Sequence, residues 1–180
     1  AGLGATYPHA ALRPLPSPWG LDVYARHPLT GATALDLDGG TGPQQQLRVR
    51  LAAPAGPVDL YAVHLAPPVS REWIRLRNRQ LATLGEQLAG GVDVPVVVAG
   101  DFNVSAYGAP FRRLLDTAGL ADARRGRGLQ VTWPAPWWPL GTPIDHVLAR
   151  GLGVAWVRSG PHLGSDHWPV EAELMMRAPG

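Results

Sequence analysis

The sequence predicts one α/β domain built around a mixed β-sheet, within residues 1–180. Short apolar or alternating segments bounded by Gly and Pro indicate strands, and two longer segments with a helical repeat lie among them. These strands and helices do not follow a strict βαβ repeat, which favours a mixed sheet over a doubly wound parallel one. A chain of this length can bury one substantial core, and neither an internal repeat nor a second domain is visible.

The first third of the chain is predicted to be mostly β-structure. Residues 1–20 are rich in proline and are expected to form an irregular lead-in without a catalytic cluster. The segments that follow alternate apolar and polar residues or are rich in β-formers, as half-exposed antiparallel strands are. Strands are predicted at Leu21–Ala25, Thr33–Leu37, Gln46–Ala52 and Val58–Leu65.

Two helices and the closing strands follow. Ser70 is a suitable N-cap, Glu72 lies in the first turn, and the next apolar residues share one helical face up to Gly90-Gly91. A second helix is predicted over Ala109–Thr117, ended by Gly119. Further strands are predicted at Val94–Ala99, Pro143–Ala149, Val154–Arg158 and Trp168–Leu174.

The composition excludes several kinds of chemistry. All 16 basic residues are Arg, but the formal net charge is only +2, which is a weak argument for nucleic-acid binding. The chain has no Cys and therefore neither a disulfide framework nor a thiolate zinc site. No apolar run approaches the roughly 18 residues that span a bilayer, and no signal-peptide pattern is visible at Ala1.

Polar residues gather at three places after apolar stretches, in Gly100–Asn103, Ile144–His146 and Gly164–His167. Asp101 and Asn103 are two residues apart at a strand end and point to the same side, which suits a metal and a phosphate oxygen. Phosphate-ester hydrolysis needs a cation, a base for the attacking water and hydrogen-bond donors. The candidates are the acids Asp101, Asp145 and Asp166, the imidazoles His64, His146 and His167, and the amide Asn103.

Each candidate also has an ordinary structural interpretation. Asp101 and Ser165-Asp166 could be turn formers, and His64 could be a core or edge histidine. His146 is expected to point to the opposite face of its strand from Asp145 and to be structural. The order of the whole set along the chain favours a common site.

The chain resembles the endonuclease/exonuclease/phosphatase superfamily over about residues 20–174. The motifs that carry the resemblance are Gly100-Asp101-Phe102-Asn103, Ser165-Asp166-His167, Tyr61–Leu65, Pro143–Val147 and the Arg77-x-x-Gln80 pattern. The resemblance implies a deoxyribonuclease I-like four-layer sandwich, in which two mixed β-sheets are flanked by helices and the motif loops meet along one edge.

The resemblance implies a phosphoester hydrolase that depends on Mg²⁺ or Mn²⁺. The implied roles divide into proton transfer and the binding of metal and phosphate. His64 would contact or protonate the phosphate region, Asp101 would orient or deprotonate the attacking water, Asp145 would pair with His167, and His167 would act as acid, base or phosphate donor; Asp101, Asn103 and Asp166 would serve the metal.

The sequence departs from the family at one motif. Members have an upstream Asn and a Glu that is the principal metal ligand, but Glu72, Glu86, Glu171 and Glu173 all lie outside that motif. We therefore expect the C-terminal part of a longer enzyme, N-terminally incomplete. A catalytically impaired pseudoenzyme or interaction module is the alternative. Missing strands would leave an unpaired sheet edge, which predicts marginal stability or self-association.

The substrate is suggested by an aromatic loop. Trp133, Trp137 and Trp138 lie among prolines and either cover the edge of the core or contact a lipid or membrane interface. The pattern looks most like bacterial membrane-anchored members, one of them associated with teicoplanin resistance. This similarity implies a lipid-linked phosphate at the extracytoplasmic side of the cell envelope; a cytoplasmic or secreted protein is the alternative.

Cleavage of DNA is the second function that the sequence allows. Arg residues are spaced by four along the predicted first helix and cluster again after Asp122. Such sets are most often solvated surface, and no aromatic residue is interleaved with them for base stacking. The two sets are Arg71, Arg75 and Arg79, and Arg124, Arg125 and Arg127.

Overall fold

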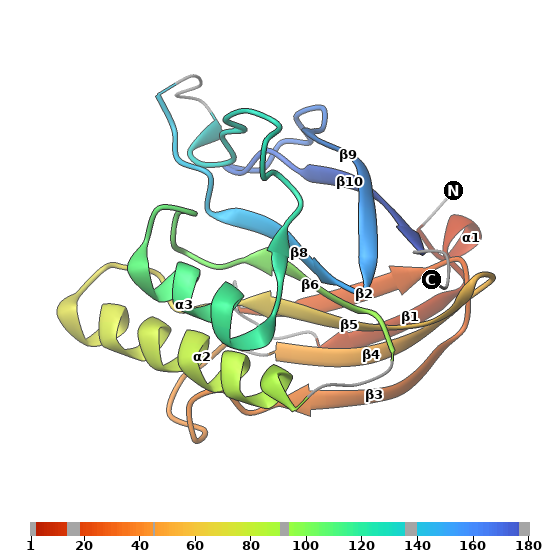
Figure 1. Cartoon of the computed structure of the whole chain (residues 1–180), viewed down its shortest axis with the longest axis horizontal. Helices are drawn as coiled ribbons and strands as arrows, with labels where there is room; N and C mark the ends of the chain where they lie inside the picture. The colour runs from red at the N-terminus through yellow and green to blue at the C-terminus, as the bar shows by residue number, and fades with distance from the viewer. Residues whose placement is uncertain (1–2, 14–18, 45, 91–93, 136–139, 177–180) are drawn as a thin grey trace.

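The computed structural model describes residues 3–13, 19–44, 46–90, 94–135 and 140–176 (Figure 1). In chain order its elements are α1 (Leu3–Thr6), β1 (His9–Arg13), β2 (Leu21–Ala25), β3 (Leu29–Leu35), β4 (Gln46–Ala53), β5 (Gly56–His64), α2 (Arg71–Ala89), β6 (Val96–Asp101), α3 (Ala109–Ala118), β7 (Ala121–Asp122), β8 (Asp145–Arg150), β9 (Leu152–Ser159) and β10 (Val170–Met176).

A six-stranded mixed sheet forms the centre of the molecule, with the strand order β3-β4-β5-β6-β8-β7. β5 and β6 run parallel, and α2 connects them; the other neighbours in this sheet are antiparallel. A parallel pair needs a crossover connection, and the amphipathic α2 provides it. The prediction of a mixed α/β fold with a large sheet flanked by helices is confirmed.

The two long helices lie together on one face of this sheet (Figure 1). Leu84 of α2 and Leu114 of α3 are buried in one core cluster with Val98 of β6. Arg150 at the end of β8 donates one guanidinium nitrogen to the carbonyls of Leu88 and Ala118, at 2.7 and 2.6 Å. The last carbonyls of a helix have no partner within the helix, so Arg150 caps both helices and joins them to the sheet.

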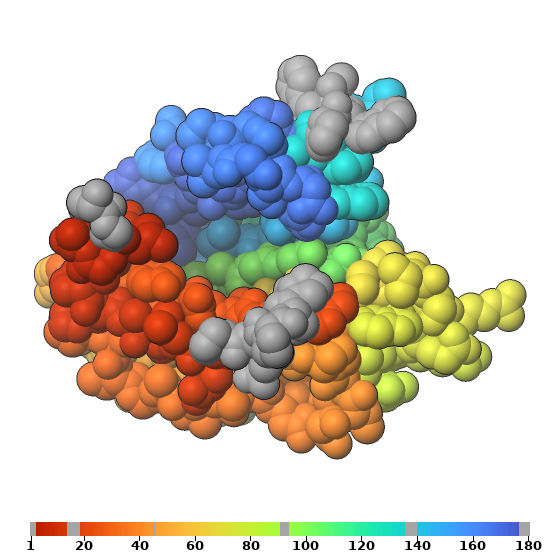
Figure 2. Space-filling model, turned by 180° about the vertical axis from the view of Figure 1, so that it is seen from behind, coloured from red at the N-terminus to blue at the C-terminus, as the bar shows by residue number. Residues whose placement is uncertain are grey.

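Two separate antiparallel strand pairs cover the opposite face. Ala11 of β1 and Val23 of β2 pack against the β4 residues Leu47 and Val49. β9 and β10 pack on the other part of this face, where Leu152 is buried with Val97 and other residues. Figure 2 shows a hollow between the first pair, in red and orange, and the second pair, in blue. Among the described residues, the second sheet of the predicted sandwich is thus represented by these two pairs.

Most predicted elements form within a few residues of the predicted bounds, and the differences are local. Ser70 caps α2 as predicted, accepting a hydrogen bond from the amide of Trp73. The lead-in is not irregular throughout, because residues 3–13 contain α1 and β1, and β1 pairs with β2 along five residues. The two-residue β7 was not predicted, and β6 continues through Asp101 instead of ending at Ala99.

The register of β5, β6 and β8 places the site residues side by side at the ends of these three strands. His64 of β5 is the neighbour of Asp101 in β6, and Asp101 is the neighbour of Asp145 in β8. The close approach of β5 and β6 requires Gly100, since an added Cβ would lie 1.9 Å from the carbonyl oxygen of Val63. The backbone of Gly100, with φ of 140°, is also one that side-chain-bearing residues rarely adopt.

Candidate active site

The six residues predicted for the site line one cleft of about 850 Å³. They come from the ends of three strands and from the loops after β6 and before β10. One wall of the cleft carries these polar groups, and apolar side chains form much of the rest. The polar set is His64, Asp101, Asn103, Asp145, Asp166 and His167, and the apolar set includes Trp19, Pro67, Pro68, Val69, Trp133 and Ile144.

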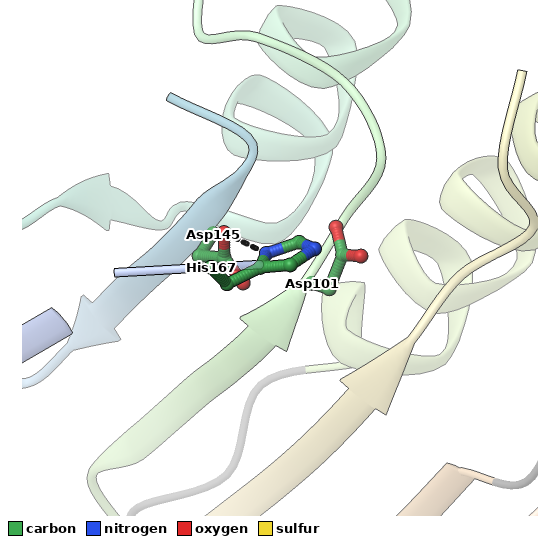
Figure 3. A group of neighbouring side chains, drawn as sticks. All are labelled: Asp101, Asp145 and His167. Carbon is green, nitrogen blue, oxygen red and sulfur yellow. Dashed lines mark hydrogen bonds and ion pairs between the residues drawn. The ribbon is translucent and has the colours of Figure 1, made fainter. Parts of the chain in front are cut away.

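The centre of the polar wall is an Asp–His pair that faces a second carboxylate (Figure 3). His167 Nδ1 lies 2.8 Å from Asp145 Oδ2, and the other ring nitrogen points toward Asp101. The hydroxyl of Thr132 accepts hydrogen bonds from the amides of Ile144 and Asp145, at 3.0 and 3.2 Å, and so fixes the start of β8. The arrangement is an imidazole oriented by one carboxylate and directed at the space beside another.

The surroundings raise the pKa of two groups in the site and lower the pKa of a third. The hydrogen bond to Asp145 raises the pKa of His167, although burial opposes the shift. Burial, followed by the charge of Asp145, raises the pKa of Asp101 to about 7. Burial lowers the pKa of His64, so this imidazole is neutral near pH 7. An imidazole with a raised pKa, a carboxyl that titrates near neutral pH and a neutral imidazole therefore share one site.

Asn103 and His64 are held by their neighbours. The amide nitrogen of the Asn103 side chain donates to the Leu65 carbonyl and to Asp101 Oδ2, at 2.9 and 3.0 Å, so its carbonyl oxygen is the atom that could bind a cation. The buried Gln46 side chain pairs with the backbone of His64, accepting from its N–H and donating to its carbonyl. His64 Nε2 lies 3.8 Å from Asp101 Oδ2.

Asp166 lies on the exposed rim of the cleft, on the loop that precedes β10. Its carbonyl accepts a hydrogen bond from the amide of Ala135, and the Trp168 indole donates to the carbonyl of Ala135. These bonds join the loop of Asp166 to the loop of Trp133. The side chain of Trp133 lines the cleft and is 42% exposed. Trp137 and Trp138, predicted to share this aromatic surface, lie outside the described residues.

The donor set fits a divalent cation such as Mg²⁺ or Mn²⁺, which prefers hard oxygen ligands. Ligand atoms of Asp101, Asp145 and His167 lie within 4.8 Å of one another. The hydrogen bond to Asp145 raises the pKa of His167, which disfavours metal binding by its ring, so the oxygens of Asp101, Asn103 and Asp166 are the better ligands. A nearby cation would also oppose the raised pKa of Asp101. None of the four Glu residues lines the cleft.

Several residues at the site were not recognised from the sequence. Trp19 belongs to the predicted lead-in, yet its ring lies 5.2 Å from that of His64 and stacks on Trp73. Gln46 was treated only as part of a strand. No local sequence signal marks either residue, because each contacts His64, which is far from it in the sequence.

His146 and Arg124 form a buried network behind the site. His146 points away from Asp145, as predicted, and is 1% exposed. The prediction of solvated surface for Arg124 was wrong: it is 7% exposed, pairs with Asp122 and donates to His146 Nδ1. Its neighbours Arg125 and Arg127 are exposed as predicted, so only Arg124 of these three Arg residues is buried.

Comparisons with known proteins agree with this fold. The model of the Endonuclease/Exonuclease/phosphatase family matches residues 6–167. Solved structures with a similar fold include an endonuclease/exonuclease/phosphatase from Beutenbergia cavernae, with 25% identity, TM-score 0.69 and 97% of this chain covered. This chain spans 55% of that protein. Among curated proteins, none matches the sequence significantly.

Two further similar structures are more distant in sequence. The mannosyl-6-phosphatase Bt3783 of Bacteroides thetaiotaomicron has 15% identity and a TM-score of 0.67, over 87% of this chain and 71% of that one. Sphingomyelinase C of Streptomyces griseocarneus has 18% identity and a TM-score of 0.65, over 94% and 78%. At these identities the likeness supports the fold alone. The family match extends over the motifs that meet in the cleft, and the chain therefore belongs to the endonuclease/exonuclease/phosphatase family.

Proposed function

We propose that this chain is a divalent-metal-dependent phosphoester hydrolase whose reaction takes place in the cleft beside His167. The observation that carries the proposal is the placement of His167, oriented by Asp145 and with a raised pKa, opposite the Asp101 carboxyl. Members of the family hydrolyse phosphoester bonds, which makes this reaction class the natural expectation.

The residues of the cleft divide the reaction between them. Asp101, whose carboxyl faces His167, takes a proton from the attacking water as the water oxygen bonds to phosphorus. His167 donates a proton to the leaving oxygen as the bond from phosphorus to that oxygen breaks. Neutral His64 holds a phosphoryl oxygen. A cation held by Asp101, Asn103 and Asp166 would neutralise charge on the phosphoryl group.

The first test is hydrolysis of bis(p-nitrophenyl) phosphate and p-nitrophenyl phosphate by the full chain, with Mg²⁺ or Mn²⁺ and with EDTA. We expect metal-dependent turnover that falls by roughly 10²- to 10⁴-fold in His167→Gln, since a positioned acid is lost. His27→Gln is the matched control, because His27 is exposed and lies outside the cleft. Absence of metal-dependent turnover would contradict the proposal and favour the catalytically impaired alternative.

We further propose that the substrate is a lipid-linked phosphate. The support is the apolar part of the cleft, where Trp133, Val69 and Pro68 adjoin the polar wall. Val69 and Trp133 are 74% and 42% exposed, so this surface can receive an apolar group while the phosphate reaches His167. A cleft of about 850 Å³ has room for far more than a phosphoryl group.

The second test compares a polyprenyl phosphate with p-nitrophenyl phosphate. Trp133→Ala should raise KM for the polyprenyl substrate by roughly tenfold, the effect of losing one buried apolar side chain, and leave the small substrate unaffected. Trp156→Ala is the control, because Trp156 is 39% exposed and lies outside the cleft. Equal use of both substrates by the wild type, or binding of duplex DNA at physiological salt in a gel shift, would contradict the lipid proposal.

We place the active protein at the extracytoplasmic side of the cell envelope, where lipid-linked phosphates and an apolar rim would meet. Among the described helices, none combines the length and apolar character needed to cross a bilayer. Cell fractionation, followed by protease treatment of spheroplasts, tests the placement: protection from the protease, or recovery in the cytoplasmic fraction, would overturn it.

A further inference from the structure

The loop that follows β6 holds an unusual backbone conformation at the site. Among the described residues, Asn103 is the only one other than Gly with a positive φ, at 50°. Asn tolerates this region better than most residues, but the conformation persists only where the surrounding structure imposes it. Asn103 is 8% exposed and lines the cleft, so the conformation of its backbone decides where its side chain lies.

Two buried basic side chains hold consecutive carbonyls of this loop. Arg77 of α2 donates Nη1 to the carbonyl of Asn103 at 2.7 Å. His146 of β8 lies with Nε2 2.9 Å from the carbonyl of Val104. The two side chains come from different elements, and each is at most 9% exposed. We call this pair, Arg77 and His146, the carbonyl clamp.

The surroundings of His146 determine which nitrogen carries its proton. A carbonyl only accepts hydrogen bonds, so Nε2 carries the hydrogen that reaches Val104. Nδ1 lies beside the guanidinium of Arg124 and 3.2 Å from Asp122 Oδ2, and neither contact changes the need for a hydrogen on Nε2. The ring packs against Phe102 and Phe111, with centroid distances of 5.3 and 4.2 Å, and these two rings also contact each other. His146 is therefore fixed in one orientation, with its donor directed at the loop.

The position of this loop sets the geometry of the active site. The Asn103 amide donates to Asp101 Oδ1 at 2.8 Å, and the Asn103 side chain donates to Asp101 Oδ2. Asp145 is the residue that precedes His146, on the other face of β8. Asp145 and His146 are consecutive residues of β8. The hydrogen bond from His146 to the Val104 carbonyl therefore fixes the loop that carries Asn103, and with it Asp101, relative to Asp145.

We propose that the carbonyl clamp holds Asn103 in its left-handed conformation and thereby positions Asn103 and Asp101 against Asp145. Arg77 and His146 are positioning residues in this role, since they act through the backbone of the loop. The expected effect of the clamp on catalysis rests on the proposed hydrolase function. Its effect on the conformation of the loop is independent of that function.

The test uses two variants at His146 in the full chain. His146→Leu can pack against the two Phe rings but cannot donate, whereas His146→Gln can place an amide N–H near the Val104 carbonyl. NMR measures hydrogen exchange at the backbone amide of Asn103, and electron paramagnetic resonance measures Mn²⁺ affinity. In His146→Leu we expect exchange to accelerate, and Mn²⁺ affinity and kcat to fall, each by roughly tenfold, the effect of one hydrogen bond. KM should change little, and His146→Gln should restore most of each value.

Two further variants keep the test decisive. Arg77→Met removes the other half of the clamp, so it gives the same exchange readout if His146→Leu does not fold. Leu152→Ala destabilises the core at β9, away from the loop, and should leave Asn103 exchange and Mn²⁺ affinity unchanged. Wild-type values in His146→Leu and Arg77→Met, or equal changes in Leu152→Ala, would overturn the clamp. If the wild type shows no turnover or Mn²⁺ binding, the proposed function fails, and Asn103 exchange alone decides the clamp.

Discussion

Asp101 and His167 differ in charge type, but both have a raised pKa. For His167 a raised pKa favours the cation, and the partner that causes it is Asp145. For Asp101 a raised pKa favours the neutral acid, because burial and the Asp145 charge penalise the carboxylate. Without a cation, both groups thus bind protons near neutral pH more strongly than they would in the unfolded chain, where Asp101 would be almost fully ionised.

The raised pKa of Asp101 predicts a specific dependence of stability on pH. Between pH 4 and pH 7 the folded state binds more protons at Asp101 than the unfolded state, so the free energy of unfolding falls as pH rises. In EDTA we expect this fall to be on the order of 2–4 kcal/mol larger in the wild type than in Asp101→Asn, which cannot titrate there. Urea unfolding at successive pH values measures the difference.

Metal and a second variant provide the controls for this prediction. Saturating Mg²⁺ should lower the pKa of Asp101 and flatten the pH dependence of the wild type, with little effect on Asp101→Asn. Asp116→Asn, which alters an exposed carboxylate on α3, should keep the wild-type slope. Identical slopes for the wild type and Asp101→Asn in EDTA would show that Asp101 is an ordinary acid.

At the scale of elements, the site depends on the close parallel pairing of β5 and β6. His64 and Asp101 are neighbours in this pairing, and the Val63 carbonyl lies where a side chain on Gly100 would begin. The Gly of the Gly100–Asn103 motif is therefore a packing requirement of the sheet, while Asp101 and Asn103 line the cleft.

Gly100→Ala is expected to destabilise the fold by about 3 kcal/mol or more, because it adds a backbone clash to a disfavoured φ. Thermal and urea unfolding measure the loss. Gly153→Ala in β9 is the matched control: its φ lies outside the positive region and its nearest neighbour would be 3.8 Å away, so it should change stability little. A Gly100→Ala variant as stable as the wild type would disprove the close approach.

Local sequence signals predicted the elements that have local causes. The Ser70 cap and the apolar face of α2 lie within one segment, and so do the breaks that bound the strands. β1 was missed because its strand character comes from pairing with β2 across the prolines of residues 14–18. β7 has only two residues and exists through its contact with β8.

The candidate site also contains residues that local motifs predict and residues that only tertiary contacts bring there. Its polar residues were predicted because their types and order form motifs, and the structure brings them into one cleft. Trp19, Gln46 and the buried Arg124 could not be predicted, since burial and contact across the sheet are tertiary properties. The roles of the six polar residues stay predictions until the variants are measured.

At the scale of the whole molecule, the two strand pairs differ from the central sheet. Among the described strands, β1 pairs only with β2, and β9 only with β10, so each pair has unpaired edges. Exposed apolar side chains accompany these edges, including Leu12 and Tyr24 on the first pair and Met175 and Met176 on the second. Singly such residues are common, but beside unpaired strands they favour association.

We expect this chain to self-associate through these strand pairs, with a mass that rises with concentration in size-exclusion chromatography with light scattering. Leu12→Lys combined with Met175→Lys should shift the protein toward monomer, because charges on edge strands oppose pairing with a second copy. Leu129→Lys, at a residue 65% exposed in the loop before β8, is the control that should leave the mass unchanged. A monomer at every concentration would contradict the expectation and show that paired strands and buried cores on both faces of the central sheet suffice for a stable, separate molecule.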